Sequence, residues 1–175
     1  MLRQRWMKCL FKKIRFGLCE ANRTIVIVFT IVTLLSGIVS AVLCRSNAMF
    51  YWCIRPSFCL PMILLVCLIT ISYLCIGAAS GIVFSNREYC KEVSKYKATL
   101  VFVIMMIFNF IWAPIFFLTC NIFVAFVDII IVLFFSVILF FLHKHINFTA
   151  ALLCGIYILI LLYLCYLNFE FLILN

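Results

Sequence analysis

The chain of 175 residues is 69% hydrophobic and only 11% charged, with a mean hydropathy of +1.34. A soluble domain carries about 25% charged residues, so this composition excludes a water-facing globule. The formal net charge is +9, but the long apolar runs leave no solvated basic face, which excludes a nucleic-acid-binding protein. The sequence therefore predicts an all-α integral membrane protein with lipids as its immediate partners.

Residues 1–23 form a basic segment ahead of the first apolar run. Large apolar side chains recur there every four residues, at Leu2, Trp6, Leu10, Ile14 and Leu18. Basic side chains fill half of the positions between them, which predicts a short amphipathic helix in the membrane interface. A mitochondrial targeting segment has the same pattern, and so has a positive flank that only sets topology.

Five apolar runs follow, each long enough to cross the hydrocarbon core of a bilayer as a helix. They are predicted at residues 24–44, 61–84, 98–118, 122–142 and 148–170. Residues 24–175 are therefore interpreted as one bundle of five transmembrane helices. Pro114 lies inside the third run and is expected to kink or end that helix.

The basic residues are distributed unevenly between the two sides of such a bundle. Twelve of the 14 Lys and Arg side chains precede the first span or lie in the loops after the second and fourth spans. Only Arg45 and Arg55 lie on the other side. By the positive-inside rule this split places the N-terminus on the cytoplasmic side and the C-terminus opposite.

Ionisable side chains are nearly absent from the spans. Asp128 is the only acidic residue in the core of one, since Glu170 stands at the end of the fifth, and we expect Asp128 to bond to a neighbouring helix or reach the interface rather than line a polar path. The His143–Lys144–His145 stretch is expected in an interfacial loop, because no third metal ligand is near. No catalytic triad, paired carboxylates or phosphate loop is present, so we expect no enzyme.

Polar and aromatic residues recur at helical spacing in the third and fifth spans. Asn109, Trp112 and Phe116 share one face of the third span. Tyr157 and Asn168 are three turns apart and share a face of the fifth span. In the second span, Gly77 and Gly81 form a G-x-x-x-G pattern, which permits close approach of another helix.

The stretch Asn109–Phe117 resembles the N-x-x-W-x-P-x-F-F signature of the translocator protein family (TspO/MBR, the tryptophan-rich sensory proteins or peripheral benzodiazepine receptors). Members carry an acid about ten residues later, as Asp128 does here. Their fifth helix carries a Tyr, then Leu-Asn and a final Asn, matched by Tyr157, Leu167–Asn168 and Asn175. The second-helix pattern is matched at Arg55–Pro56, Pro61, Thr70, Tyr73 and Gly77.

The chain departs from this family at several positions. Family tryptophans are replaced by Ile63, Ile69 and Ile160, and Ile156 stands where the family has a proline before Tyr157. No basic residue follows Lys144, so the family's C-terminal cholesterol motif is incomplete.

The resemblance implies a pocket between five helices that binds a tetrapyrrole such as haem or protoporphyrin, or a sterol, as a ligand; no cofactor is required. The implied function is a receptor or carrier in the outer mitochondrial membrane or another organelle membrane, with the oligomeric state open and a homodimer as one option. The site residues carried over, or inferred beside them, are Trp112, Asn109, Phe116, Leu65, Leu68, Tyr73, Tyr157, Leu167, Asn168 and Arg55.

Two other functions and a purely structural role remain open at this level. A secondary transporter of a small solute is disfavoured because the spans lack charged sites and paired broken helices. A membrane-embedded lipid-modifying enzyme would need acid, base or nucleophilic groups at one depth, and the sequence offers no such cluster. A purely structural membrane protein would show no saturable ligand binding.

Overall fold

The computed structural model describes residues 21–44, 61–85 and 92–174. They form five helices: α2 (Arg23–Leu43), α4 (Met62–Ser85), α5 (Glu92–Phe117), α6 (Ile122–Ile146) and α7 (Phe148–Leu174). All five are long and apolar enough to cross a membrane, which confirms the predicted all-α fold of five spans. Most of the basic segment 1–23, and Arg55, lie outside the described residues.

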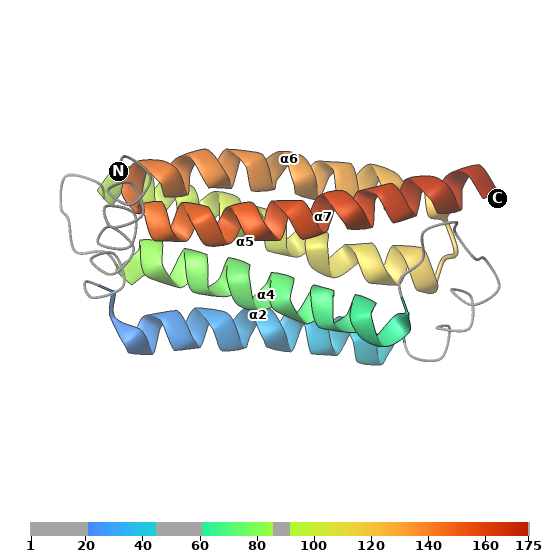
Figure 1. Cartoon of the computed structure of the whole chain (residues 1–175), viewed down its shortest axis with the longest axis horizontal. Coiled ribbons are helices and arrows are strands. Elements are labelled where there is room, and N and C mark those ends of the chain that lie inside the picture. The colour runs from blue at the N-terminus through green and yellow to red at the C-terminus, as the bar shows by residue number, and fades with distance from the viewer. Residues whose placement is uncertain (1–20, 45–60, 86–91, 175) are drawn as a thin grey trace, which may run out of the picture.

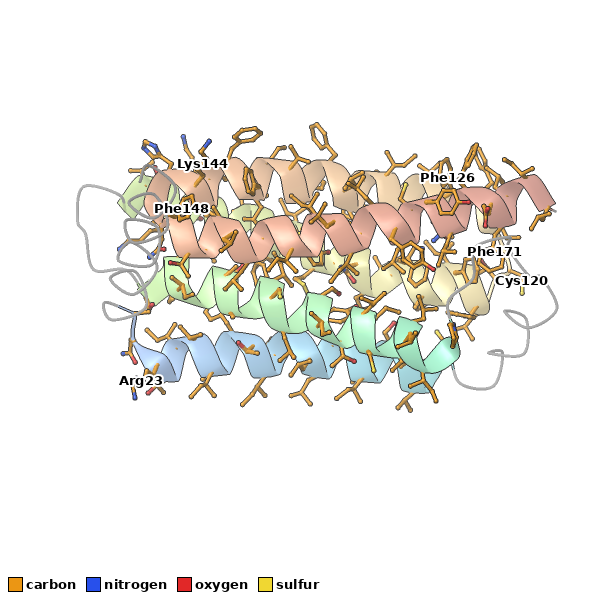
Figure 2. The ribbon with its side chains drawn as sticks, in the orientation of Figure 1. Arg23, Cys120, Phe126, Lys144, Phe148 and Phe171 are labelled. Carbon is orange, nitrogen blue, oxygen red and sulfur yellow. The ribbon has the colours of Figure 1, made fainter. Side chains whose placement is uncertain are left out.

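The helices lie side by side (Figure 1), and their mutual contacts close a ring. Helix α4 packs between α2 and α7, and α6 packs between α7 and α5. Helix α5 returns to α2, and this side of the ring is the most sparsely packed of the five. Successive helices alternate in direction, so Arg23, Lys144 and Phe148 lie at one end of the bundle while Cys120 and Phe171 lie at the other (Figure 2).

Asparagine side chains begin three of the helices. Asn22 accepts a hydrogen bond from the Thr24 backbone N–H at 3.1 Å, and Asn121 accepts one from the Val124 N–H at 3.1 Å. Asn147 accepts one from the Thr149 N–H at 2.8 Å. Each bond satisfies a backbone donor that the first helical turn leaves without a partner.

The ends of α5 and α7 differ from the sequence prediction. Helix α5 begins at Glu92, six residues before the predicted residue 98. The prediction missed this first part of the helix because it is polar and lies outside the apolar run. It continues three residues past Pro114 before ending, and the Pro114 carbonyl accepts bonds from the next two free N–H groups. Helix α7 runs to Leu174 rather than to residue 170.

The predicted interfacial loop at His143–Lys144–His145 is wrong. These residues form the last turn of α6, where positive or polarisable side chains suit the negative end of the helix dipole. Only Asn147, in extended conformation, separates α6 from α7. His143 is 1% exposed and so lies inside the bundle, not at its surface.

The close approach of α2 and α4 depends on glycine, as the G-x-x-x-G pattern predicts. A Cβ at Gly81 would lie 2.7 Å from the Val26 Cα, and one at Gly77 would lie 2.8 Å from the Thr30 Cα. The Thr33 hydroxyl donates to the Tyr73 carbonyl across this contact at 3.1 Å. The two helices are therefore in backbone contact, and both glycines are needed for it.

Candidate functional site

A cavity with a volume of about 200 Å³ lies between α2, α4, α5 and α7. We call it the outer cavity. The predicted residues that line it are Leu65, Tyr73, Trp112, Phe116, Leu167 and Asn168. Predicted residues up to about a hundred positions apart in the sequence therefore lie around one cavity, because four helices of the ring line it.

One wall of the outer cavity is aromatic. The Trp112 and Phe116 rings are stacked, with centroids 5.5 Å apart and an interplanar angle of 22°. Phe171 of α7 meets Phe116 edge-on at 5.4 Å. Phe116 is 1% exposed and Phe171 2%, so neighbouring side chains fix the rings. Such a wall offers a flat, preformed apolar face to a ligand.

The indole of Trp112 is held in place by a polar contact to α7. Its Nε1–H donates to the Asn168 Oδ1 at 3.3 Å, and the Asn168 Nδ2 donates to the Leu164 carbonyl at 2.8 Å. Asn168 is 3% exposed. Both ends of its amide are therefore hydrogen-bonded, and the Asn168 side chain orients Trp112.

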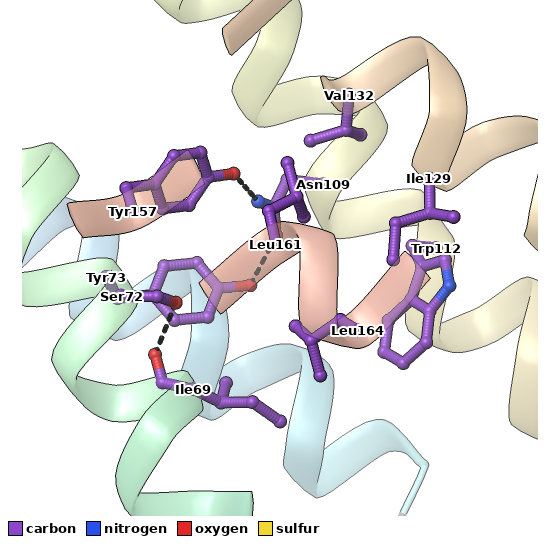
Figure 3. Close-up of a pocket in the computed structure, with 10 residues that line it drawn as sticks. All are labelled: Ile69, Ser72, Tyr73, Asn109, Trp112, Ile129, Val132, Tyr157, Leu161 and Leu164. Atoms are coloured by element: carbon purple, nitrogen blue, oxygen red, sulfur yellow. Dashed lines mark hydrogen bonds between the residues drawn. The ribbon is translucent and has the colours of Figure 1, made fainter. Parts of the chain in front are cut away.

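A smaller cavity of about 40 Å³ adjoins the first, and we call it the inner cavity (Figure 3). The two share Ile69, Tyr73, Trp112 and Leu164 as lining residues. The volume of the inner cavity is enough for one or two water molecules. A buried water needs polar partners, and Tyr73, Asn109 and Tyr157 on the wall of this cavity carry such groups.

A chain of hydrogen bonds joins three helices at the inner cavity (Figure 3). The Tyr73 hydroxyl of α4 donates to the Asn109 Oδ1 of α5 at 2.7 Å. The Asn109 Nδ2 donates to the Tyr157 hydroxyl of α7 at 2.6 Å. Tyr157 is 1% exposed, so this polar chain is enclosed by the bundle. It fixes the mutual positions of α4, α5 and α7 where the two cavities meet.

Eight of the ten sequence-predicted site residues therefore lie around two adjoining cavities. Leu68 does not: it is half-buried and is among the lining residues of neither cavity. Leu65, Ile69 and Tyr73 follow one another at four-residue spacing along α4, and Leu68 lies one position, or about 100°, away from Ile69. Arg55 lies outside the described residues. Ligand binding by any of the ten stays a prediction.

Sequence reasoning missed the contribution of α2. Gly37, Ser40, Ala41 and Cys44 line the outer cavity. These small side chains recur at spacings of three and four residues, so they form one face of α2. That stripe was the available signal, because small residues along one helix face leave space between helices.

Charge is absent from both cavities: none of the described lining residues is charged. Asp128 is 6% exposed and its Oδ2 has no hydrogen-bond partner, so the expected bond to a neighbouring helix is not made by that oxygen. It lines neither cavity. What the site offers is aromatic and aliphatic contact with a few hydrogen-bonding groups.

A comparison with known protein families identifies a family for the chain. The model of the TspO/MBR family matches residues 24–174, which includes all five helices and both cavities. No curated protein matches the chain. The matched region covers far more than half of the sequence and agrees with the signature at Asn109–Phe117. This chain therefore belongs to the TspO/MBR family and is an integral membrane protein of five helices.

Proposed function

We propose that the protein is a membrane receptor or carrier that binds a flat apolar ligand, a porphyrin or a sterol, in the outer cavity. The observation that carries the proposal is the composition of that cavity. Stacked Trp112 and Phe116 form one wall, while aliphatic side chains and a few polar groups complete the lining. Small-molecule pockets have this mixture of mostly apolar surface and a few orienting polar groups.

The volume of the outer cavity limits which ligands fit without a change in structure. Pockets for drug-sized ligands measure about 300–1,000 Å³, whereas the outer cavity measures about 200 Å³. A porphyrin or sterol therefore needs the cavity to widen. The sparse packing of α2 on α5 makes that side of the ring the place where widening disrupts the fewest contacts.

The two other candidate functions fit the lining less well. A transporter of a polar solute calls for charged or strongly polar groups facing the path. A lipid-modifying enzyme calls for an acid, a base or a nucleophile at one depth. The described lining of the two cavities is uncharged, which supports binding over either. A homodimer and an outer mitochondrial or other organelle membrane stay predictions from the family resemblance.

Competition between two ligand classes tests the proposal. Protoporphyrin is titrated into the purified protein in lipid nanodiscs at increasing cholesterol, with empty nanodiscs as the control. We expect saturable porphyrin binding whose apparent Kd rises in proportion to cholesterol, because both molecules need the same cavity. Non-saturable uptake equal to that of empty nanodiscs would refute binding, and saturable porphyrin binding indifferent to cholesterol would refute a shared site.

A further inference from the structure

Ser40 of α2 is a buried hydroxyl without a hydrogen-bond partner at the wall of the outer cavity. Its side chain lines the cavity together with Ala41 and Cys44. The residue is 4% exposed, and its Oγ has no partner in the described structure. An unsatisfied hydroxyl in an apolar setting is costly, and in lipid no bulk water relieves it.

The other hydroxyl side chains along the middle of α2 differ from Ser40. Thr30 donates to the Val26 carbonyl at 2.8 Å, Thr33 to the Thr30 carbonyl at 2.9 Å, and Ser36 to the Thr33 carbonyl at 2.7 Å. This bond to the preceding turn is the usual way for a helix in a membrane to satisfy a serine or threonine. Ser40 does not make it, although the same kind of carbonyl lies one turn before it.

The remaining oxygen and nitrogen side-chain groups on the cavity wall are already engaged. The Tyr73 hydroxyl donates to Asn109, and the amide of Asn168 is bonded at both ends. Among the described lining residues, Ser40 thus carries the hydroxyl that a ligand can bond without displacing an existing hydrogen bond of the protein. Rotation about its single χ1 carries the oxygen between three staggered positions.

We propose that Ser40 is the hydrogen-bonding anchor for a neutral oxygen, a hydroxyl or a ketone, on an otherwise apolar ligand. The inference rests on the proposed function and narrows its ligand class. A neutral group is required because the described lining has no charge to pair with an ionised one, and an unpaired charge is not buried. A carboxylate-bearing ligand has to keep its acid groups outside this cavity.

A cycle of two proteins and two probes tests the anchor. Cholesterol and cholest-5-ene, which lacks only the 3-hydroxyl, are titrated into wild type and Ser40→Ala in nanodiscs. We expect Ser40→Ala to weaken cholesterol binding about five-fold, the effect of one hydrogen bond, and to leave cholest-5-ene binding unchanged. Ser36→Ala is the matched control, because it removes a hydroxyl one turn earlier that bonds its own helix; it should not distinguish the two probes.

Each other outcome has a separate meaning. If wild type binds both sterols equally, or if Ser40→Ala weakens both by the same factor, the anchor is wrong while the cavity stands. If wild type binds neither sterol saturably, the proposal that the ligand is a sterol is wrong. The protoporphyrin titration then decides whether the proposed function is wrong as well. Binding of cholest-5-ene also reports that Ser40→Ala is folded.

Discussion

Gly77→Ala is expected to destabilise the protein by about 3 kcal/mol, the upper part of the usual range for overpacking. The added methyl carbon would lie 2.8 Å from the Thr30 Cα and against the Thr33 hydroxyl. A side chain can rotate away from such a contact, but a backbone carbon moves only with its helix. The clash outweighs the gain of about 1 kcal/mol in helix propensity that alanine brings over glycine. Reversible unfolding in mixed detergent measures the difference.

Gly155→Ala provides the matched control for this prediction. It is the same change inside α7, two turns from the start of that helix, and the nearest atom to the new methyl carbon is a ring carbon of Phe140 at 3.6 Å, an ordinary contact. We expect it to be neutral or slightly stabilising. Equal effects of the two substitutions would mean that α2 and α4 are not in the backbone contact described above.

Trp112→Ala is expected to weaken ligand binding by about 2 kcal/mol, which is about thirty-fold in Kd. Trp112 is the side chain that stacks on Phe116 and also lines both cavities. Its removal takes away the flat face on which an aromatic or sterol ring lies. The protoporphyrin titration in nanodiscs measures this loss directly.

Two variants separate a lost contact from a lost fold. Phe123→Ala removes an aromatic ring that is 61% exposed on the lipid-facing side of α6, and it should leave the Kd unchanged. Trp112→Phe keeps a ring in place but loses the bond from Nε1–H to Asn168, so a loss of only a few-fold is expected. Unchanged binding in Trp112→Ala would show that the ligand partitions into lipid instead of the cavity.

Much of the fold follows from the sequence because lipid imposes a simple rule. Backbone groups in hydrocarbon must bond within their own helix, so five apolar runs specify five helices. The ends are less well specified, since a helix continues into polar sequence wherever packing supports it. His143 shows this: its polar neighbours indicated a loop, yet α6 continues through it and the bundle encloses the imidazole.

The site was predictable on the helices that carry a recognisable pattern. Asn109, Trp112 and Tyr157 stand at helical spacing and match the family signature, and the ring of helices brings them together. The part from α2 escaped prediction because it consists of small residues, whose spacing is read as helix packing. Three-dimensional packing, and not the local sequence, decides whether the Ser40 hydroxyl bonds its own helix or stays without a partner at a cavity wall.

Photo-crosslinking tests the central claim, a ligand held inside the ring of helices, most directly. A cholesterol analogue with a photoreactive group is bound to the protein in nanodiscs, irradiated, and its attachment sites are identified by peptide mass spectrometry. We predict labels on cavity-lining residues such as Leu65, Phe116 and Leu167, and their loss when unlabelled cholesterol is added in excess. Labels confined to lipid-facing residues such as Phe123 and Phe134, undiminished by the competitor, would contradict an internal binding site.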